Sequence, residues 1–222
     1  MYSQKYLSDI LVRLAHHSTA LEGNTISLPE TVVIILESSL PGSHKSIREF
    51  YEIDNHKQAF RLLLDALDDQ PPLSLSLILS LHAALTDRLQ ADSGHFKSTD
   101  NAIIGATFQT APPGQVPYLV QQWVDNTNHR LATAHSEADI LHILADSHIH
   151  FERIHPFSDG NGRTGRLLLL FLSMRDLPAP VIISKEDRGA YIEALADQDV
   201  QALAALMAEK LQEEKARRQT FA

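Results

Sequence analysis

Apolar side chains recur every three or four residues along most of this chain, which is the spacing of one face of an α-helix. Leu7, Ile10 and Leu14 follow this spacing in a first helix expected over residues 4–22. The sequence therefore predicts an all-α fold, and we expect the tail after the last helix to be solvated or frayed. The same pattern predicts further helices over residues 27–40, 46–67, 74–89, 117–132, 136–154, 161–175, 187–195 and 200–215.

One stretch breaks the helical pattern. Residues 92–117 are rich in Gly, Pro, Ser and Thr, and within them only Ala102–Phe108 has the composition of a β-strand. Two interpretations stay open for this stretch. It is either a surface loop without a role or a β-hairpin that runs from about Asn101 to Val116.

The segment from residue 148 to residue 175 predicts a helix, a polar loop and a second helix. Pro156 disfavours the α conformation of the residue before it, so the first helix should end there. Gly160 and Gly162 allow backbone angles that other residues avoid, and they let a ligand approach the backbone closely. The second helix should begin near Asn161 or the glycine that follows it.

The start of this second helix suits an anion. Its first backbone N–H groups have no partner within the helix, and the positive end of the helix dipole lies there. Arg163 and Arg166 share a helix face, so they add two guanidinium groups to a cradle for phosphates. Asp159 offers an oxygen ligand to a Mg²⁺ ion that bridges those phosphates, and His155 is a candidate base. Each feature alone is more often structural, but their combination predicts a phosphate or nucleotide site.

Residues 155–166, HPFSDGNGRTGR, resemble the signature of Fic-domain proteins, His-Pro-Phe-x-Asp/Glu-Gly-Asn-Gly-Arg-x-x-Arg, at every defining position. The resemblance covers about residues 45–210. It implies the Fic fold, a bundle of about eight helices with a short β-hairpin flap beside the active site. It also implies a protein adenylyltransferase, or AMPylator. Such a nucleotidyltransferase moves AMP from ATP to a Ser, Thr or Tyr hydroxyl of a target protein.

The resemblance implies a role for each residue of the motif. His155 would be the catalytic base that deprotonates the target hydroxyl, and Asp159 would be the Mg²⁺ ligand. ATP and Mg²⁺ are therefore the expected cofactors. The remaining residues would bind the nucleotide: Gly160, Asn161 and Gly162 around the α- and β-phosphates, Arg163 at the β-phosphate and Arg166 at the γ-phosphate.

Glu22 stands at an unfavourable place in the first helix. Gly23 should end that helix, which leaves Glu22 in the last turn, where a carboxylate is disfavoured unless a cation is near. A solvated surface glutamate is one explanation. The segment Ser18-Thr-Ala-Leu-Glu22-Gly23 is also similar to the inhibitory motif of Fic proteins, Ser/Thr-x-x-x-Glu-Gly/Asn. That resemblance implies autoinhibition in cis, in which Glu22 pairs with Arg166 and holds it away from the γ-phosphate.

Three more expectations come from the resemblance alone. The flap of Fic proteins pairs with an extended segment of the target by β-strand addition, so Asn101 to Val116 would bind the target protein. Lys97 stands where family members commonly have an arginine. Tyr191 would line the adenine. Residues 1–44 would form an N-terminal segment with the inhibitory helix, and residues 45–222 would form the catalytic domain.

Histidines outside the motif predict no metal site. His148 and His150 are two residues apart, which puts them on different faces of a helix and makes them a poor pair of zinc ligands. His82 is expected to be a packing histidine, and His56 is given no role.

Composition narrows the class of protein. A length of 222 residues suits one domain, and a formal charge of −9 argues against a general nucleic-acid binder. The chain has no cysteine, which excludes disulfides, thiol catalysis and cysteine-type zinc sites. It shows neither a secretory signal nor an apolar run near the roughly 20 residues that span a bilayer. We therefore expect a cytoplasmic protein without a membrane partner, and homo-oligomer formation stays open.

Other functions of this fold stay open beside AMP transfer. They are Fic-type transfer of another nucleotide or phosphate group, de-AMPylation, and a non-catalytic nucleotide-binding module. No lysine replaces Gly160 or Gly162, which argues against a kinase variant with inverted ATP.

Overall fold

The computed structural model describes residues 2–39, 45–68, 72–102 and 108–221, and all regular secondary structure within them is helical. This confirms the all-α expectation. A π-helical turn, η1 (Val33–Glu37), continues α2, and two 3₁₀ turns, η2 (Pro113–Gln115) and η3 (Lys185–Asp187), precede α6 and α9. The α-helices are α1 (Gln4–Ala20), α2 (Leu28–Val32), α3 (Ile47–Asp54), α4 (His56–Asp68), α5 (Leu75–Leu85), α6 (Val116–Ala132), α7 (Glu137–Ile154), α8 (Asn161–Asp176), α9 (Arg188–Asp197) and α10 (Val200–Gln219).

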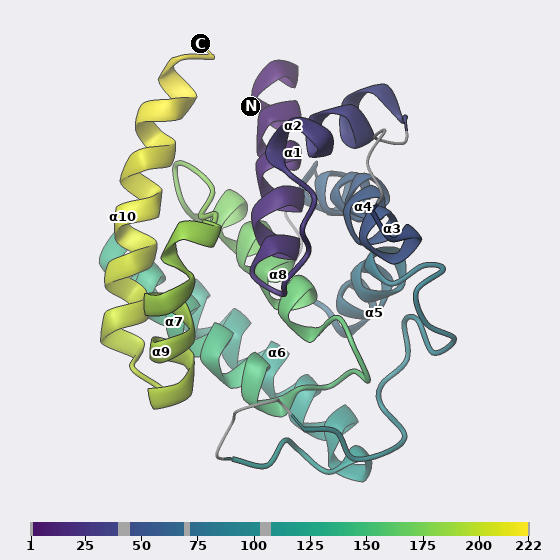
Figure 1. Ribbon diagram of the computed structural model, residues 1–222. Coiled ribbons are helices and arrows are strands. Elements are labelled where there is room, and N and C mark those ends of the chain that lie inside the picture. The colour runs from purple at the N-terminus through teal and green to yellow at the C-terminus, as the bar shows by residue number, and fades with distance from the viewer. Residues whose placement is uncertain (1, 40–44, 69–71, 103–107, 222) are drawn as a thin grey trace.

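Helix α8 lies at the centre of the fold, with α1, α4, α5 and α7 packed against it (Figure 1). Every residue from Arg163 to Met174 is buried. A helix that is apolar on all sides, as this one is from Leu167 to Leu172, can only be stable inside a core. The polar first turn of α8 therefore reaches the edge of the core, where its backbone N–H groups and arginines meet α1 and the loop from α7.

Serine caps fix several helix starts. The side chains of Ser27 and Ser46 accept from the backbone N–H groups of Glu30 and Glu49, and the two glutamates return the contact in full capping boxes. The predicted helix over residues 46–67 is divided into α3 and α4 at Asn55. The amide of Asn55 donates to the carbonyl oxygens of Leu85 and Asp87 at distances of 3.0 and 2.8 Å, which ties this break to the end of α5.

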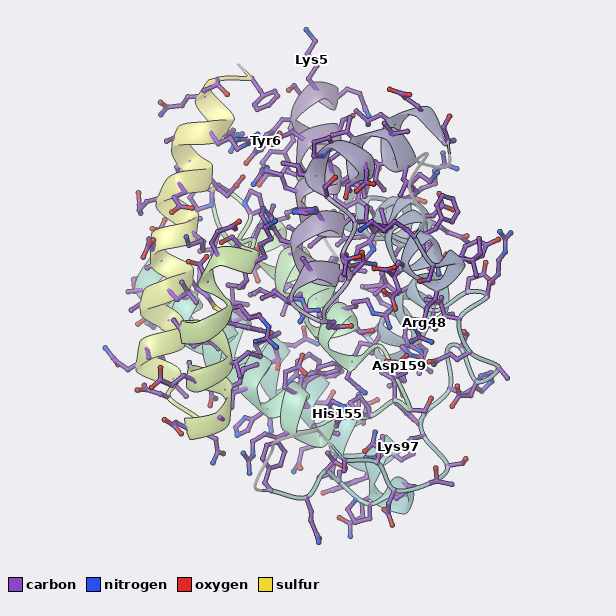
Figure 2. All side chains as sticks on the ribbon, viewed as in Figure 1. Lys5, Tyr6, Arg48, Lys97, His155 and Asp159 are labelled. Carbon is purple, nitrogen blue, oxygen red and sulfur yellow. The ribbon has the colours of Figure 1, made fainter. Side chains whose placement is uncertain are left out.

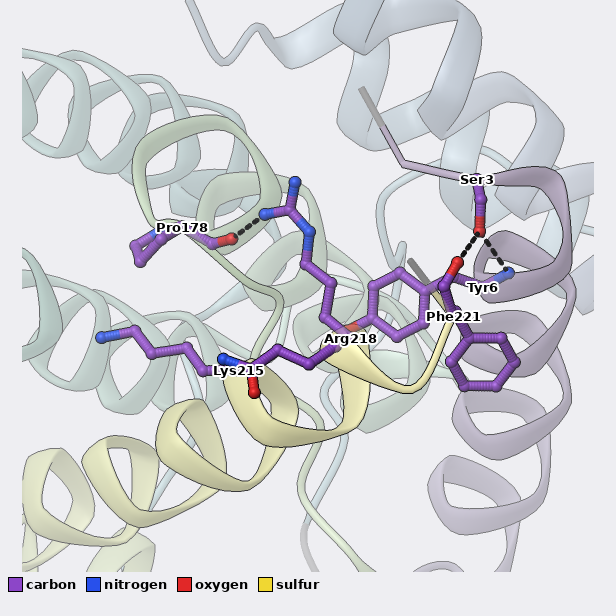
Figure 3. A pocket seen from close by; sticks show the side chains of 7 residues that line it. Ser3, Tyr6, Pro178, Lys215, Arg218 and Phe221 are labelled. Atoms are coloured by element: carbon purple, nitrogen blue, oxygen red, sulfur yellow. Dashed lines mark hydrogen bonds between the residues drawn. The ribbon is translucent and has the colours of Figure 1, made fainter.

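The tail is not frayed, although most of the residues from 213 to 221 are exposed, as the alternative of a solvated tail predicts. Helix α10 continues to Gln219, and Glu214 on it is only 4% exposed. The Glu214 carboxylate accepts from the hydroxyl of Tyr6 at 2.7 Å and from Nη2 of Arg13 at 2.9 Å. Figure 3 shows the same end of the molecule, where the hydroxyl of Ser3 donates to the carbonyl of Phe221 at 3.2 Å. The outer half of α1 is thus held by the last turns of α10.

The predicted flap is not confirmed as a β-hairpin. Residues 103–107 of the expected hairpin lie outside the described residues, and no strand occurs in its described part, 101–102 and 108–115. The described residues on either side of positions 103–107 nevertheless meet, because the hydroxyl of Thr110 donates to the carbonyl of Asn101 at 2.9 Å. Within the described part of the chain, no helix has the length and apolarity that crossing a membrane requires.

Candidate active site

The connection between α7 and α8 forms as the sequence predicts. Helix α7 ends at Ile154, one residue before His155-Pro156, and α8 begins at Asn161. His155 takes the left-handed conformation with φ of 49°, and Gly160 does so with φ of 77°. A non-glycine residue in this region is strained, and such strain is common where a side chain is held for function.

Side chains inside the loop hold its shape. Asn161 accepts from the backbone N–H of Phe157 and donates to its carbonyl, both at 2.8 Å, so its amide is used by the loop itself. His82 lies flat against the Phe157 ring, with centroids 3.6 Å apart. Its Nε2 donates to the carbonyl of Asp159 at 3.0 Å, because its Nδ1 already accepts from the N–H of Gly94. His82 is therefore a packing histidine, as expected, and it supports the loop between α7 and α8.

His155 is arranged as a base. Its Nδ1 lies 3.2 Å from the carbonyl of Glu152, and a carbonyl can only accept, so the proton is on Nδ1. The lone pair is then on Nε2. Burial lowers the pKa of His155 below its ordinary value, which keeps the ring neutral near pH 7. A neutral imidazole with a free Nε2 can take a proton from a hydroxyl.

Glu22 contacts both arginines of the motif. One carboxylate oxygen, Oε1, lies 2.5 Å from Nη2 of Arg166, and the other, Oε2, lies 3.0 Å from Nε of Arg163. Arg166 also donates from Nε to the hydroxyl of Ser18 at 2.9 Å and from Nη2 to its carbonyl at 2.8 Å. The expected Glu22–Arg166 pair is therefore present, and the contact with Arg163 is an addition that the sequence did not predict.

The end of α1 differs slightly from the expectation. The helix ends at Ala20, and Glu22 lies in the following turn, where its N–H donates to the carbonyl of Thr19 at 3.0 Å. Gly23 closes the turn with φ of 99°, a conformation that glycine adopts easily. The carboxylate near the negative end of α1 is explained by the cations of α8. Burial alone would lower the pKa of Arg166, but the charge of Glu22 raises it above its ordinary value.

The Glu22 carboxylate occupies the position that suits a phosphate. A Cβ on Gly162 would lie 2.6 Å from Oε1 of Glu22, so this anion rests directly on the first turn of α8. Arg163, which is 1% exposed, has an Nη1 without a hydrogen-bond partner in the described part of the chain. An anionic oxygen beside helix N–H groups and two guanidinium groups is the chemistry of a bound phosphate. The residues present therefore fit a nucleoside triphosphate.

Asp159 offers one oxygen to a cation. Its Oδ1 accepts the N–H of Gly160 at 2.7 Å and lies 3.5 Å from Nη2 of Arg163. Its Oδ2 lies 2.5 Å from Nη2 of Arg48. Burial would raise the pKa of Asp159, but Arg163, the N–H of Gly160 and Arg48 together lower it, so the carboxylate is ionised. No group of three His, Cys, Asp or Glu side chains that could hold a metal occurs among the described residues, so Mg²⁺ would need phosphate ligands as well.

Lys97 joins the predicted flap to the loop between α7 and α8. Its side chain, 3% exposed, donates to Oδ1 of Asn101 at 2.6 Å and to the hydroxyl of Thr110 at 3.0 Å. Its backbone N–H donates to the carbonyl of Pro156 at 2.9 Å, and Asn101 donates to the carbonyl of Phe157 at 2.7 Å. Sequence reasoning gave Lys97 no role. Its only signal was a lysine where related proteins commonly have an arginine.

Another acid, the half-buried Glu152 of α7, lies behind the motif. Burial raises the pKa of Glu152 to about 7. The positive charge of Arg166 opposes this shift, and the negative charge of Glu22 adds to it. Its Oε1 has no hydrogen-bond partner among the described residues and lies 4.0 Å from Nε2 of His148. His148 in turn lies 2.7 Å from the hydroxyl of Tyr191, which is 1% exposed. Tyr191 is thus a core residue in this arrangement.

The histidines at positions 56, 148 and 150 do not converge. His148 is buried against Tyr191, whereas the His150 side chain is 59% exposed and lies 3.8 Å from Asp146. His56 is buried on α4, where its Nδ1 donates to the carbonyl of Glu52 at 2.8 Å. Burial lowers the pKa of His56 to about 3, so it stays neutral near the two arginines of the motif.

Comparison with known proteins agrees with this site. Residues 72–173 match the model of the Fic/DOC family. The protein adenylyltransferase fic-1 of Caenorhabditis briggsae is 33% identical over 183 residues, which are 81% of this chain and 35% of that protein. The chain therefore spans about a third of the length of the curated relatives it matches.

Solved structures agree as well. A Fic domain containing signaling protein from Bacteroides thetaiotaomicron superposes with a TM-score of 0.85 at 24% identity, over 98% of this chain and 90% of that one. Fic-1 from Caenorhabditis elegans superposes with a TM-score of 0.80 at 27% identity, over 96% of this chain and 64% of that one. The family match includes the loop and both arginines. Residues 72–173 of this chain therefore form a domain of the Fic/DOC family.

Proposed function

We propose that this chain is a protein adenylyltransferase, which transfers AMP from ATP to a Ser, Thr or Tyr hydroxyl of a target protein. Two observations support the proposal. Relatives such as fic-1 of Caenorhabditis briggsae are named protein adenylyltransferases. The observation that carries most weight is the anion-binding site at the start of α8, where Glu22 lies between Arg163 and Arg166.

The proposed reaction is an in-line displacement at the α-phosphorus. The target hydroxyl oxygen forms the new bond to phosphorus, its proton goes to Nε2 of His155, and the bond between the α- and β-phosphates breaks to release pyrophosphate. Gly160 and Gly162 let the backbone approach the phosphates, and the two arginines stabilise their charge. Asp159 would hold Mg²⁺, which supplies charge neutralisation on the leaving pyrophosphate. Positioning and electrostatics account for most of the rate.

The target would bind along the segment from Asn101 to Val116. Lys97 and Asn101 support this assignment, because they attach the start of the segment to the loop that carries His155. A strand of the target paired with this segment would present its hydroxyl to the α-phosphate. We also propose that Tyr191 lines the adenine, which requires a rearrangement around a side chain that is 1% exposed here.

Autoinhibition in cis by Glu22 is part of the proposal. The Glu22 carboxylate lies in the anion-binding site and contacts Arg166. Ser18, in the last turn of α1, accepts from the same guanidinium group. A nucleotide would have to displace Glu22 to bring its γ-phosphate to Arg166. Residues 1–44 would then be a regulatory segment, and residues 45–222 the catalytic domain.

The position of a radioactive label tests the reaction. The Glu22→Gly chain is incubated with candidate acceptor proteins and with ATP labelled at either the α- or the γ-phosphate. We expect label on protein from the α-phosphate only. Label from the γ-phosphate only would mean phosphate transfer. No label at all would favour a binding module, and loss of AMP from a modified target would favour de-AMPylation.

Substitution of His155 tests its role. In the Glu22→Gly background, His155→Ala should lower AMP transfer by about 10²–10⁴-fold, which is the usual contribution of a general base. ATP affinity measured by calorimetry should change little, because His155 makes no phosphate contact in this proposal. His150→Ala is the matched control, since His150 is an exposed histidine on α7 outside the motif. Undiminished labelling by the His155→Ala chain would remove His155 from the mechanism.

A further inference from the structure

Arg48 of α3 contacts the acid of the catalytic loop. Its Nη2 lies 2.5 Å from Oδ2 of Asp159, and Figure 2 shows the two side chains side by side. The other oxygen of Asp159 is already used by the N–H of Gly160 and faces Arg163. Oδ2 is therefore the oxygen through which Asp159 would bind a metal, and a guanidinium group covers it.

Neighbouring residues of α3 hold Arg48 in this place. Its Nε lies 3.1 Å from Oε1 of Glu52. The second oxygen of Glu52 accepts from the amide of Asn24 at 2.9 Å, and that amide also donates to the carbonyl of Glu49 at 3.0 Å. Asn24 lies in the turn that carries Glu22. Helix α3 therefore contacts the turn that carries Glu22, and it also carries the arginine that contacts Asp159.

We propose that Arg48 is a resident cation on Asp159, which a nucleotide-bound Mg²⁺ has to displace. The inference rests on the proposed nucleotide site and extends it. In the arrangement described, side chains of the protein fill both halves of the Mg²⁺–ATP site. Glu22 takes the place of a phosphate on Arg166, and Arg48 takes the place of the metal on Asp159.

The size of the effect follows from exposure. The side chain of Arg48 is 53% exposed and that of Asp159 is 45% exposed, so solvent screens their attraction. Ion pairs of this kind change an equilibrium constant by at most about fivefold. Arg48 should therefore set the Mg²⁺ concentration that the site requires without blocking the metal altogether.

Calorimetry tests this without any catalytic turnover. Binding of the non-hydrolysable analogue AMPPNP to the Glu22→Gly chain is measured over a series of Mg²⁺ concentrations. The midpoint of the Mg²⁺-dependent gain in affinity is then compared with that of the chain that also carries Arg48→Gln. We expect the midpoint to fall by about two- to fivefold. An unchanged or higher midpoint would overturn the proposal, whatever the transferase activity is.

A second variant separates the contact from the general charge. Lys45→Gln removes a positive charge three residues away, from a side chain that donates to Thr25 and makes no contact with Asp159. We expect its midpoint to stay at that of the parent. An equal fall in both variants would also overturn the proposal, because it would assign the effect to net charge. Glu52→Gln removes the carboxylate that holds Arg48 in place, so it should also lower the midpoint. A rise of the midpoint in this variant would count against the proposal.

Discussion

Oε1 of Glu22 lies 2.5 Å from Nη2 of Arg166, although the two residues are 144 positions apart in the sequence. Arg166 is 6% exposed. A buried guanidinium group without an anionic partner is costly, so this site needs a negative charge in every state. In the proposed mechanism, the carboxylate and a nucleotide phosphate are alternative partners for the same cation. This exchange is the physical basis of the proposed autoinhibition.

Gly162→Ala should weaken nucleotide binding without unfolding the protein. The added methyl group would lie 2.6 Å from Oε1 of Glu22 and 2.8 Å from Nη1 of Arg166, both at the ends of flexible side chains. In the Glu22→Gly background the same methyl group meets the phosphates. We expect AMPPNP affinity to fall about tenfold or more, a loss of about 1.4 kcal/mol or more, while the melting temperature changes little.

The matched control for Gly162 is Gly189→Ala. Gly189 lies in α9, and a Cβ there has no atom within 4 Å. Its nucleotide affinity should equal that of the parent. An equal loss of affinity in the two variants would place the phosphates away from the first turn of α8.

Lys97→Met should impair transfer more than nucleotide binding. The substitution removes the donor to Asn101 and Thr110, which hold the base of the predicted flap. Loss of these buried hydrogen bonds should lower the free energy of unfolding by about 1–3 kcal/mol. We expect a lower kcat for AMP transfer with a nearly unchanged AMPPNP affinity. Lys5→Met, at an exposed lysine of α1 (Figure 2), is the control. Full activity of a folded Lys97→Met chain would mean that the segment from Asn101 to Val116 does not bind the target.

Local signals predicted most of the fold. The break before Pro156, the start of α8 at Asn161 and the serine caps each follow from the properties of one or two neighbouring residues. Apolar spacing located nearly all the long helices. The predicted hairpin was not confirmed, because residues 103–107, most of its strand-like part, lie outside the described residues and no strand occurs in its described part. The division at Asn55 depends on carbonyl groups of α5, which are distant in the sequence.

The site was predictable only in part. The Glu22–Arg166 pair followed from resemblance to a motif, and the loop chemistry followed from the residues themselves. Contacts that link distant surface or buried residues carry no local pattern, and three of these were missed. They are Arg48 with Asp159, Glu22 with Arg163, and Asn101 with Phe157. The packing of α10 on α1 through Glu214 was missed for the same reason.

Glu152 should make stability depend on pH. Burial raises its pKa to about 7 from an ordinary value of 4.5, so the folded state keeps a proton that the unfolded state loses between these values. Stability contributed by the neutral acid is complete below pH 4.5 and is lost as the pH rises through 7. Glu152→Gln stays neutral, so its stability relative to the parent should rise by roughly 2–3 kcal/mol from pH 5 to pH 8.

Urea denaturation at the two pH values measures this difference. Glu193→Gln, at an exposed position of α9, serves as the control and should show nearly the same difference from the parent at both. A pH-independent difference for Glu152→Gln would mean that this carboxyl is ionised in the folded protein.

The rate of AMP transfer by the Glu22→Gly chain tests the central claim most directly. The unmodified chain and the Glu22→Gly chain are each incubated with Mg²⁺ and with ATP labelled at the α-phosphate, and the label on protein is followed with time. Loss of a charge-assisted contact worth about 1.5–3 kcal/mol should raise the initial rate at least about tenfold over that of the unmodified chain. Equal rates in the two chains would contradict the claim that Glu22 and the nucleotide compete for Arg166.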